Sequence, residues 1–311
     1  SLLKVTQDLH LFGLKIFLCQ VNLKITQLFL DQQIILKMLL LKKNYKNLNI
    51  PSVKFRSRTN IYLKEFVSQL KKSNPSIVEI HNRPSYLLYL HKKFKKIKYF
   101  LIIHNDPQNL EGSSSLKQRI ELLNICEQIY FVSLWVEDKF FEGIEKNYYS
   151  NFKTIYPSIK KITNKPKKEN LIIFSGKLNS AKGFDIFCSA MIKILNKYKN
   201  WKAMAIGDEP RQNIFIKHKN LLYTGWIQHE KVLKIYNKSS ITVVPSSWEE
   251  PFGRSSLEAG SRGNAVIISR KGGLPETIAT PIILSRVTSE CIFKEVDELI
   301  KNKKKLSELQ K

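Results

Sequence analysis

Short apolar runs alternate with helix-like stretches along the chain from residue 169 onward, and this alternation constrains the fold more than any other feature. The expected strands are residues 171–174, 202–206, 221–223, 241–244 and 265–268. Helical patterns lie between them at residues 184–198, 229–237 and 254–261. Strands that alternate with helices in this way predict a parallel sheet covered by helices on both faces. The C-terminal half is therefore expected to be a Rossmann-like α/β domain.

Length adds a second domain to this expectation. At 311 residues the chain exceeds the usual size of a single hydrophobic core. Residues 160–170 are polar, charged and interrupted by Pro166, which is typical of an exposed linker. We therefore predict two α/β domains, over residues 1–165 and 166–311, with a last helical segment at residues 295–310.

Polar side chains follow the strands that are expected in the first half. Runs at residues 77–80 and 99–103 end in His81-Asn82 and His104-Asn105, and a third run at residues 128–132 ends at Ser133. Open α/β sheets bind ligands at the carboxyl ends of their parallel strands. These positions are therefore candidate site residues.

The chain is strongly basic, with 52 Lys and Arg against 26 Asp and Glu and a formal net charge of +26. This charge indicates an anionic partner, but lysines scattered along the whole chain describe a solvated surface equally well. No zinc-knuckle spacing or aromatic platform typical of nucleic-acid binding is present, and we predict neither a nucleic-acid partner nor a metal site. Charged residues interrupt the apolar region 11–41, so neither a spanning helix nor a cleavable signal is expected.

Residues 176–183 form a loop between an expected strand and an expected helix. The loop carries Lys177 and Lys182 and begins and ends with Gly176 and Gly183. Ammonium groups beside free backbone N–H groups at a helix start would bind a diphosphate well. The loop matches neither the P-loop nor the G-x-G-x-x-G pattern, and two loop lysines in a lysine-rich chain are more often simply solvated.

Two glutamates, Glu250 and Glu258, bracket a Pro-Phe-Gly turn and the start of a helix. Gly253 in this turn lets backbone N–H groups approach a ligand closely, and both carboxylates could contact one bound molecule. The helix dipole alone also favours glutamate near a helix start, which leaves a purely structural explanation open. The pair Gly272-Gly273 follows the next strand and again permits close backbone approach. All these loops follow strands of one predicted sheet, so they are expected to line one rim.

These motifs together resemble the GT-B glycosyltransferases, and specifically the retaining enzymes called glycosyltransferase family 4 or group 1. The resemblance is specific over residues 171–278. The family patterns G-[RK]-L, K-G, G-D, E-x-F-G-x-x-x-x-E-A and G-G-x-P-E occur here as Gly176-Lys177-Leu178, Lys182-Gly183, Gly207-Asp208, Glu250 to Gly253 with Glu258-Ala259, and Gly272-Gly273-Leu274-Pro275-Glu276. It implies two Rossmann-like domains facing across a cleft, with the acceptor in the first and the nucleotide sugar in the second.

The resemblance also implies roles for single residues. Lys177 and Lys182 would hold the diphosphate of the nucleotide sugar, Glu250 would contact the sugar, and His104 would lie near the transferred sugar. Together these form the expected catalytic set. The expected binding set comprises Gly176, Gly183, Trp226, Ile227, Phe252, Gly253, Arg254, Ser255, Glu258, Gly272 and Gly273, with Glu258 on the ribose hydroxyls and Trp226-Ile227 near the base.

The first half departs from the family. Residues 75–81 look like the family stretch P-D-[IV]-[IV]-H-x-H, but its glycine-rich loop after the first strand has no counterpart near Gly13. Residues 155–159 lack the Asn and Gly of I-P-N-G-[VI], and the chain stops at Lys311 before the helix that commonly packs back on the first domain. An incomplete N-terminal domain and a truncated or degraded enzyme therefore stay open.

The expected function is metal-independent and cofactor-free transfer of a sugar from a nucleotide-diphosphate sugar to a glycan or lipid-linked acceptor, with retained anomeric configuration. Cell-envelope polysaccharide or lipopolysaccharide synthesis is the expected setting, in the cytoplasm or peripherally at the inner face of an anionic membrane. Two alternatives stay open: a nucleotide-sugar 2-epimerase, and a non-catalytic or decayed GT-B protein that binds anionic membrane or ligand.

Overall fold

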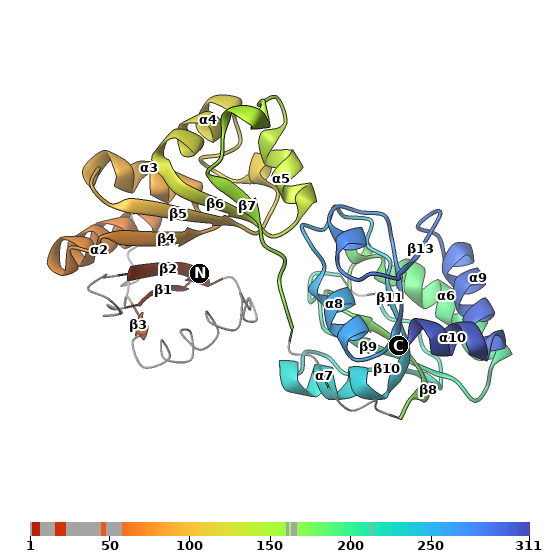
Figure 1. Ribbon diagram of the computed structural model, residues 1–311. Coiled ribbons are helices and arrows are strands. Elements are labelled where there is room, and N and C mark those ends of the chain that lie inside the picture. The colour runs from red at the N-terminus through yellow and green to blue at the C-terminus, as the bar shows by residue number, and fades with distance from the viewer. Residues whose placement is uncertain are drawn as a thin grey trace. The chain divides into compact units, whose positions relative to one another are not determined.

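The chain folds into two compact units, Ser1–Ser158 and Ile159–Lys311. Their structure is a computed structural model that describes residues 2–6, 16–22, 45–47, 58–159, 162, 167–212 and 214–311 (Figure 1). Each unit has its own β-sheet. The predicted boundary lies between residues 165 and 166, both of which are outside the described ranges, and it stays a prediction.

The second unit has a fully parallel sheet of six strands. The strands are β8 (Glu169–Ser175), β9 (Lys202–Ile206), β10 (Leu221–Tyr223), β11 (Ser239–Val244), β12 (Ala265–Ile268) and β13 (Ile282–Ile283). They lie in the order β10-β9-β8-β11-β12-β13. Counted from β8 this is the 3-2-1-4-5-6 order of the Rossmann fold, and the order reverses between β8 and β11. The predicted Rossmann-like fold is confirmed.

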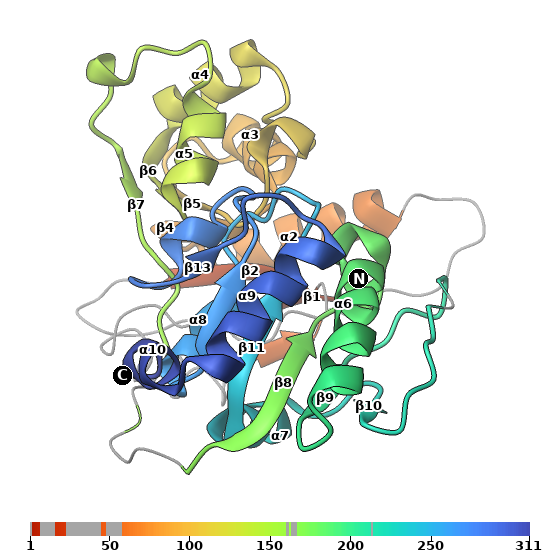
Figure 2. The same ribbon diagram turned by 90° about the vertical axis from the view of Figure 1, so that its right-hand side faces the viewer.

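Helices cover both faces of this sheet, as the continuous apolar strands predict. Ile172 and Phe174 face the layer formed by α6 (Phe184–Lys197) and α9 (Ser289–Lys301), which run side by side over one face (Figure 2). Leu171 and Ile173 face the layer of α7 (His229–Lys238) and α8 (Arg254–Ser261).

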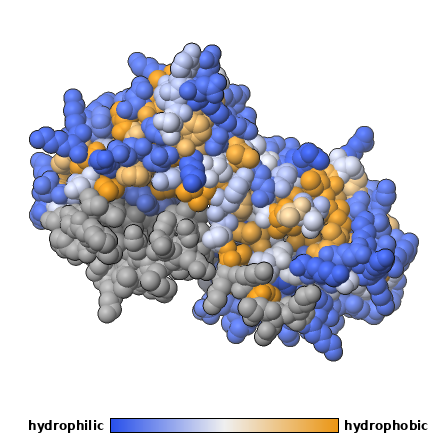
Figure 3. Space-filling model, viewed as in Figure 1, coloured by the Kyte–Doolittle hydropathy of each residue, from blue (hydrophilic) through white to orange (hydrophobic). Residues whose placement is uncertain are grey.

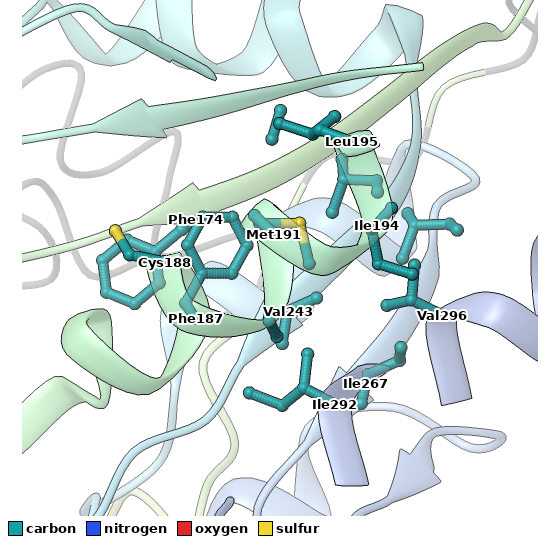
Figure 4. Packing of buried hydrophobic residues seen from close by; sticks show 14 of the residues in the cluster. Phe174, Phe187, Cys188, Met191, Ile194, Leu195, Val243, Ile267, Ile292 and Val296 are labelled. Atoms are coloured by element: carbon teal, nitrogen blue, oxygen red, sulfur yellow. The ribbon is translucent and has the colours of Figure 1, made fainter. Parts of the chain in front are cut away.

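The first of these layers is the larger apolar core of the second unit. Figure 4 shows Phe187 and Met191 of α6 lying toward Ile292 and Val296 of α9, and all four side chains are fully buried. Burying one such side chain contributes about 1.5–3 kcal/mol, so this layer holds the sheet edges and their loops in a fixed frame.

The predicted helix at residues 295–310 is wrong in one respect. Helix α9 already begins at Ser289 and ends at Lys301. A separate helix, α10 (Lys303–Leu309), follows after Asn302. The Asn302 side chain accepts a hydrogen bond from the backbone N–H of Lys305 at 3.0 Å. Asparagine is among the best N-caps, and here it starts a second helix inside an otherwise helical pattern.

The first unit has a mixed sheet of seven strands in the order β3-β1-β2-β4-β5-β6-β7. These strands are β1 (Leu2–Thr6), β2 (Ile16–Asn22), β3 (Tyr45–Asn47), β4 (Ile77–His81), β5 (Lys98–Ile103), β6 (Cys126–Phe131) and β7 (Phe152–Thr154). Strand β1 is antiparallel to both its neighbours, and the sheet is parallel from β2 to β7. The three strands predicted before residue 133 are present as β4, β5 and β6.

Among the described residues of the first unit, four α-helices accompany this sheet, and the sequence patterns did not identify them. They are α2 (Arg58–Ser73), α3 (Pro84–Lys93), α4 (Leu116–Ile125) and α5 (Leu134–Phe141). No helix within the described ranges is both long and apolar enough to span a membrane. Gly13, where a glycine-rich loop was expected to be missing, lies outside the described residues.

Candidate ligand site at the switch point of the second sheet

The loops after β8 and β11 are fastened to each other at the point where the strand order reverses. The backbone carbonyl of Ala181 accepts hydrogen bonds from the N–H groups of Ser247 and Trp248, both at 3.0 Å. Ser246 donates its hydroxyl to the same carbonyl at 3.2 Å. Ligands of open α/β sheets bind outside such a switch point, so these joined loops form the candidate site.

Gly183 fixes how closely the two loops approach. Its φ is +70°, and a Cβ added there would lie 2.0 Å from the carbonyl oxygen of Pro245. Any larger residue would push the start of α6 away from the loop after β11. The predicted glycine therefore has a packing role in addition to its conformational one.

Lys182 and Glu250 lie together in this site. The Lys182 Nζ is 2.5 Å from Glu250 Oε1, and the two side chains are 32 % and 11 % exposed. Predicted residues that are 68 positions apart in sequence are thus brought into one ion pair. The ammonium is partly open to solvent, so an anionic ligand can reach it.

Lys177 lies in the same loop but does not join this pair. Its side chain is exposed and forms no ion pair with any residue that the structure describes. The neighbouring Gly176 donates its N–H to Ile206 at 3.0 Å, and Gly207 donates to Gly225 at 3.0 Å. These bonds link the loops after β8, β9 and β10.

The loop after β10 presents the predicted Trp226 to solvent. The Trp226 side chain is 66 % exposed, whereas Ile227 packs in part against the apolar layer under α7 and α8. An exposed indole on this rim offers a flat apolar surface to a ligand.

The double glycine wraps around the backbone of Glu250. Gly273 donates its N–H to the Glu250 carbonyl at 2.7 Å, and a Cβ on Gly272 would lie 2.1 Å from that oxygen. The carboxylate of Glu249 accepts a hydrogen bond from the Gly272 N–H at 2.6 Å and pairs with Lys271 Nζ at 2.9 Å. The group that approaches these two glycines closely is therefore the backbone of Glu250, and not a ligand as the sequence suggested.

The Pro-Phe-Gly turn starts α8 with its backbone, while its aromatic ring is buried. Phe252 is 5 % exposed. Gly253 has a φ of +118°, and a Cβ there would lie 2.4 Å from the Leu274 side chain. Ser255 donates its hydroxyl to the Ser175 carbonyl at 3.0 Å, which ties the first turn of α8 to the end of β8.

Glu258 lies one turn further along α8 and is held by two basic side chains. His229 Nε2 and Arg254 Nη2 each lie 2.9 Å from Glu258 Oε1. Burial and the Glu258 charge both raise the pKa of the Tyr236 hydroxyl. His229 was not predicted, because no local pattern connects it to a glutamate 29 residues away.

A second cluster of candidate residues lies in the first unit. His81 Nδ1 is 2.9 Å from His104 Nε2, and His81 Nε2 is 2.6 Å from Glu79 Oε1. The two imidazole rings are stacked at an interplanar angle of 9°. Burial, with a smaller contribution from His81, holds the pKa of His104 well below its usual value. His104 is thus a neutral ring whose buried Nδ1 has no hydrogen-bond partner.

The carboxylate of Glu79 and the amide of Asn82 support this cluster. Asn82 Oδ1 accepts the backbone N–H groups of His104 and Asn105, both at 3.2 Å. Sequence reasoning gave Glu79 no role. In the part of the chain that the structure describes, no group of three His, Cys, Asp or Glu side chains could hold a metal ion.

The family described as glycosyl transferases group 1 matches residues 156–311, which is half of the chain and includes the whole switch-point site. The chain belongs to the group 1 glycosyl transferases. This confirms the resemblance at the level of group 1.

Two relatives are similar over most of the chain. Spore coat protein SA of Bacillus subtilis (strain 168) is 24 % identical over 68 % of this chain and 64 % of its own length. A 42.6 kDa protein in the cps region of Klebsiella pneumoniae is 29 % identical over 75 % of this chain and 65 % of its own. The chain thus spans slightly less than two thirds of these relatives.

Solved structures share the fold. HepE of Anabaena, in complex with UDP-glucose, superposes with a TM-score of 0.63 at 14 % identity, over 80 % of this chain and 74 % of that protein. This group 1 member therefore has the predicted GT-B fold class.

Proposed function

We propose that the protein transfers a sugar from a nucleotide-diphosphate sugar to a glycan or lipid-linked acceptor, with retention of anomeric configuration. Cell-envelope polysaccharide or lipopolysaccharide synthesis is the setting that we propose. The observation that carries this proposal is the Lys182–Glu250 pair at the switch point of a group 1 domain. A cation and a carboxylate in contact offer one partner to a diphosphate and the other to sugar hydroxyls.

In this proposal the two lysines act on the diphosphate. Lys182 turns from Glu250 to the diphosphate when the nucleotide sugar binds, and the exposed Lys177 adds a second positive charge. As the bond between sugar and diphosphate breaks, negative charge grows on the leaving oxygen, and fixed cations there lower the barrier. The reaction then needs no divalent ion and no cofactor.

Glu250 is assigned to the sugar and not to covalent catalysis. Once Lys182 has moved to the diphosphate, the nearly buried Glu250 carboxylate needs new hydrogen-bond donors, and sugar hydroxyls supply them. The backbone of Phe252 and Gly253 at the start of α8 completes this contact. The acceptor hydroxyl attacks from the side of the departing diphosphate, and this leaving group takes up the hydroxyl proton as the bond between sugar and diphosphate breaks. Attack from that side retains configuration.

His104 is proposed to contact the transferred sugar. Its neutral ring carries an unpartnered, buried nitrogen, and its other nitrogen is committed to His81. Such a nitrogen gains most from a ligand hydroxyl, because a buried polar atom without a partner is costly.

A peripheral, cytoplasmic position on an anionic membrane is also proposed. Helix α3 ends in Lys92 and Lys93, and Lys95 and Lys96 follow it, all with exposed side chains. In Figure 3, mostly hydrophilic side chains cover the end of the first unit where α2 and α3 lie. Equal binding to neutral and anionic vesicles at low salt would contradict this position.

The experiment for the main proposal is a titration of nucleoside diphosphates and nucleotide sugars on the wild type and on Lys182→Met. The wild type is expected to bind at least one of them, and Lys182→Met is expected to lose at least tenfold in affinity. Release of nucleoside diphosphate that depends on an added acceptor would separate a transferase from a 2-epimerase. No binding of any nucleotide sugar would refute the assignment.

A further inference from the structure

A carboxylate and two imidazole rings form a continuous chain of hydrogen bonds in the first unit. Glu79 Oε1 lies 2.6 Å from His81 Nε2, and His81 Nδ1 lies 2.9 Å from His104 Nε2. Glu79 and His81 are two residues apart on β4, so their side chains share one face of the sheet, and His104 follows the neighbouring strand β5. The chain ends at His104 Nδ1, which is buried and has no hydrogen-bond partner among the described residues.

The carboxylate decides which nitrogen of each ring carries a proton. An ionised carboxylate only accepts hydrogen bonds, so His81 Nε2 carries a proton and donates to Glu79. The Nδ1 of a neutral His81 is then an acceptor, and the atom that faces it, His104 Nε2, is the donor. Burial, with a smaller contribution from His81, lowers the pKa of His104 well below its usual value, so this ring is neutral and has one proton to place. With that proton on Nε2, Nδ1 is left as an acceptor.

His104 is held on both its backbone and its ring. Asn82 Oδ1 accepts the backbone N–H groups of His104 and Asn105, both at 3.2 Å. The ring planes of His81 and His104 differ by only 9°, so an N–H of one ring can point at the in-plane lone pair of the other. We propose that Glu79 and His81 are positioning residues that hold the His104 proton on Nε2, so that the buried Nδ1 accepts a hydrogen bond from a hydroxyl of the transferred sugar. The ligand in this inference rests on the proposed function, but the position of the proton does not.

A protonated His81 is the competing arrangement. It would donate from both nitrogens, and His104 would then accept at Nε2 and carry its proton on Nδ1. The Glu79 side chain is 26 % exposed, so water helps to stabilise its charge without a proton on His81. Burial and the Glu79 charge raise the pKa of Tyr130 on β6, so that hydroxyl adds no further charge. These surroundings favour the neutral arrangement, and the two arrangements place the His104 proton on different atoms.

Nitrogen-15 NMR of the imidazole rings in ligand-free protein tests the position of the proton, because protonated and bare ring nitrogens differ strongly in chemical shift. The wild type is expected to carry the proton of both rings on Nε2. Glu79→Leu removes the acceptor and is expected to give a mixture of tautomers at His104. Glu79→Gln keeps a carbonyl oxygen that can accept from His81, and it is expected to retain most of the wild-type tautomer. Glu127→Leu, an exposed carboxylate on β6 of the same sheet, is the matched control and keeps the wild-type spectrum of both rings.

Calorimetric titration tests the ligand contact with UDP-glucose and GDP-mannose, each beside analogues in which one sugar hydroxyl is replaced by hydrogen or by fluorine. Fluorine cannot donate a hydrogen bond, so an acceptor at Nδ1 loses its partner in both kinds of analogue. At one hydroxyl position, both analogues are expected to bind the wild type about tenfold or more weakly than the parent sugar. Glu79→Leu is expected to reduce this preference several-fold, whereas Glu127→Leu keeps it.

Each outcome supports or overturns a stated part of the inference. A His104 proton on Nδ1 in the wild type overturns the whole of it, and unchanged tautomers in Glu79→Leu overturn the role of Glu79. Wild type that binds every analogue as well as its parent sugar overturns the contact at Nδ1 alone. Wild type that binds no nucleotide sugar refutes the proposed function and that contact together, while the NMR result still stands. His81→Leu removes the same constraint on His104 and keeps the test available if Glu79→Leu does not fold.

Discussion

Lys182 and Glu250 form an ion pair across β8 and β11, the two strands between which the order of the second sheet reverses. Neither side chain is freely solvated, and Glu250 is the more buried of the two. The pair therefore neutralises a carboxylate that is largely shielded from water. In the proposed function a bound ligand gives each of the two groups another partner. Stability and ligand affinity depend on the pair in different ways.

Replacement of Lys182 is expected to show this difference. Lys182→Met leaves the Glu250 carboxylate without its cation and should cost about 1–2 kcal/mol, less than a fully buried pair because Lys182 is 32 % exposed. Adding Glu250→Gln should restore most of that stability but none of the nucleotide affinity. Urea unfolding of both single variants and the double variant measures the coupling. Purely additive losses would mean that the two side chains do not interact.

Lys177→Met is the control for that experiment. This lysine is exposed and forms no ion pair with the described residues, so its loss should change the free energy of unfolding by less than about 0.5 kcal/mol. Its effect should appear only in nucleotide affinity. A large loss of stability would show that Lys177 has a structural role.

Alanine substitutions at two glycines with similar φ angles can distinguish the cost of a steric clash from the cost of backbone strain. Gly183 and Gly225 have φ values of +70° and +64°, but an added Cβ meets the Pro245 carbonyl only at Gly183. Gly225→Ala should cost about 1–2 kcal/mol from backbone strain alone. Gly183→Ala adds a steric overlap and should cost about 1–3 kcal/mol more. Equal melting temperatures for the two variants would contradict the close approach of the loops.

Lys168 is expected to make the free energy of unfolding change with pH in the alkaline range. Its ammonium donates to the carbonyls of Tyr236 and Arg262 near the ends of α7 and α8, and burial lowers its pKa to about 8. Between this value and about 10.4 the unfolded chain binds more protons than the native one, so stability rises with pH through that window. Lys168→Met should lack this rise when both proteins are unfolded in urea at pH 7.5 and 9.5. Parallel curves would contradict the lowered pKa.

His104 is expected to stay neutral in mildly acidic solution. Burial and the neighbouring His81 lower its pKa, whereas in the unfolded chain it takes up a proton near pH 6.5. The unfolded state therefore binds the extra proton, and stability falls as pH falls below that value. Nitrogen-15 NMR of the ring, assigned with His104→Gln, measures the titration directly. A midpoint at or above 6.5 would show that the ring is not shielded.

Local pattern was enough to predict five of the six strands of the second sheet, but not the short strand β13. Strand β12 is buried along its whole length and appears as an uninterrupted apolar run, which is why it lies where the sequence predicts it. The pairing of Lys182 with Glu250, and of His229 with Glu258, depends on how loops meet after 68 and 29 residues of chain. The periodicity of hydrophobic residues within one segment does not predict contacts between side chains so far apart in sequence.

The first unit was harder to predict because its helices begin on caps and not on strong apolar periods. Helix α3 starts with Pro84, and α5 starts behind Ser133, whose hydroxyl accepts the Val136 N–H at 3.1 Å. Ser133 was expected at a ligand-binding strand end, and its hydroxyl is committed to this cap. The role of Glu79 was likewise hidden, since only the folded sheet brings it to His81.

The wrapping of Gly272 and Gly273 around Glu250 has a consequence for redesign of this protein. The backbone path of the loop at Glu250, which we propose contacts the sugar, is held by a neighbouring loop in which Gly272 leaves no room for even one methyl group. Grafting a foreign loop in place of the Pro-Phe-Gly turn would require replacing both segments together. A change of sugar preference is more accessible through side chains on a fixed backbone, and Pro251, Arg254 and Ser255 are the partly exposed positions where such libraries should begin.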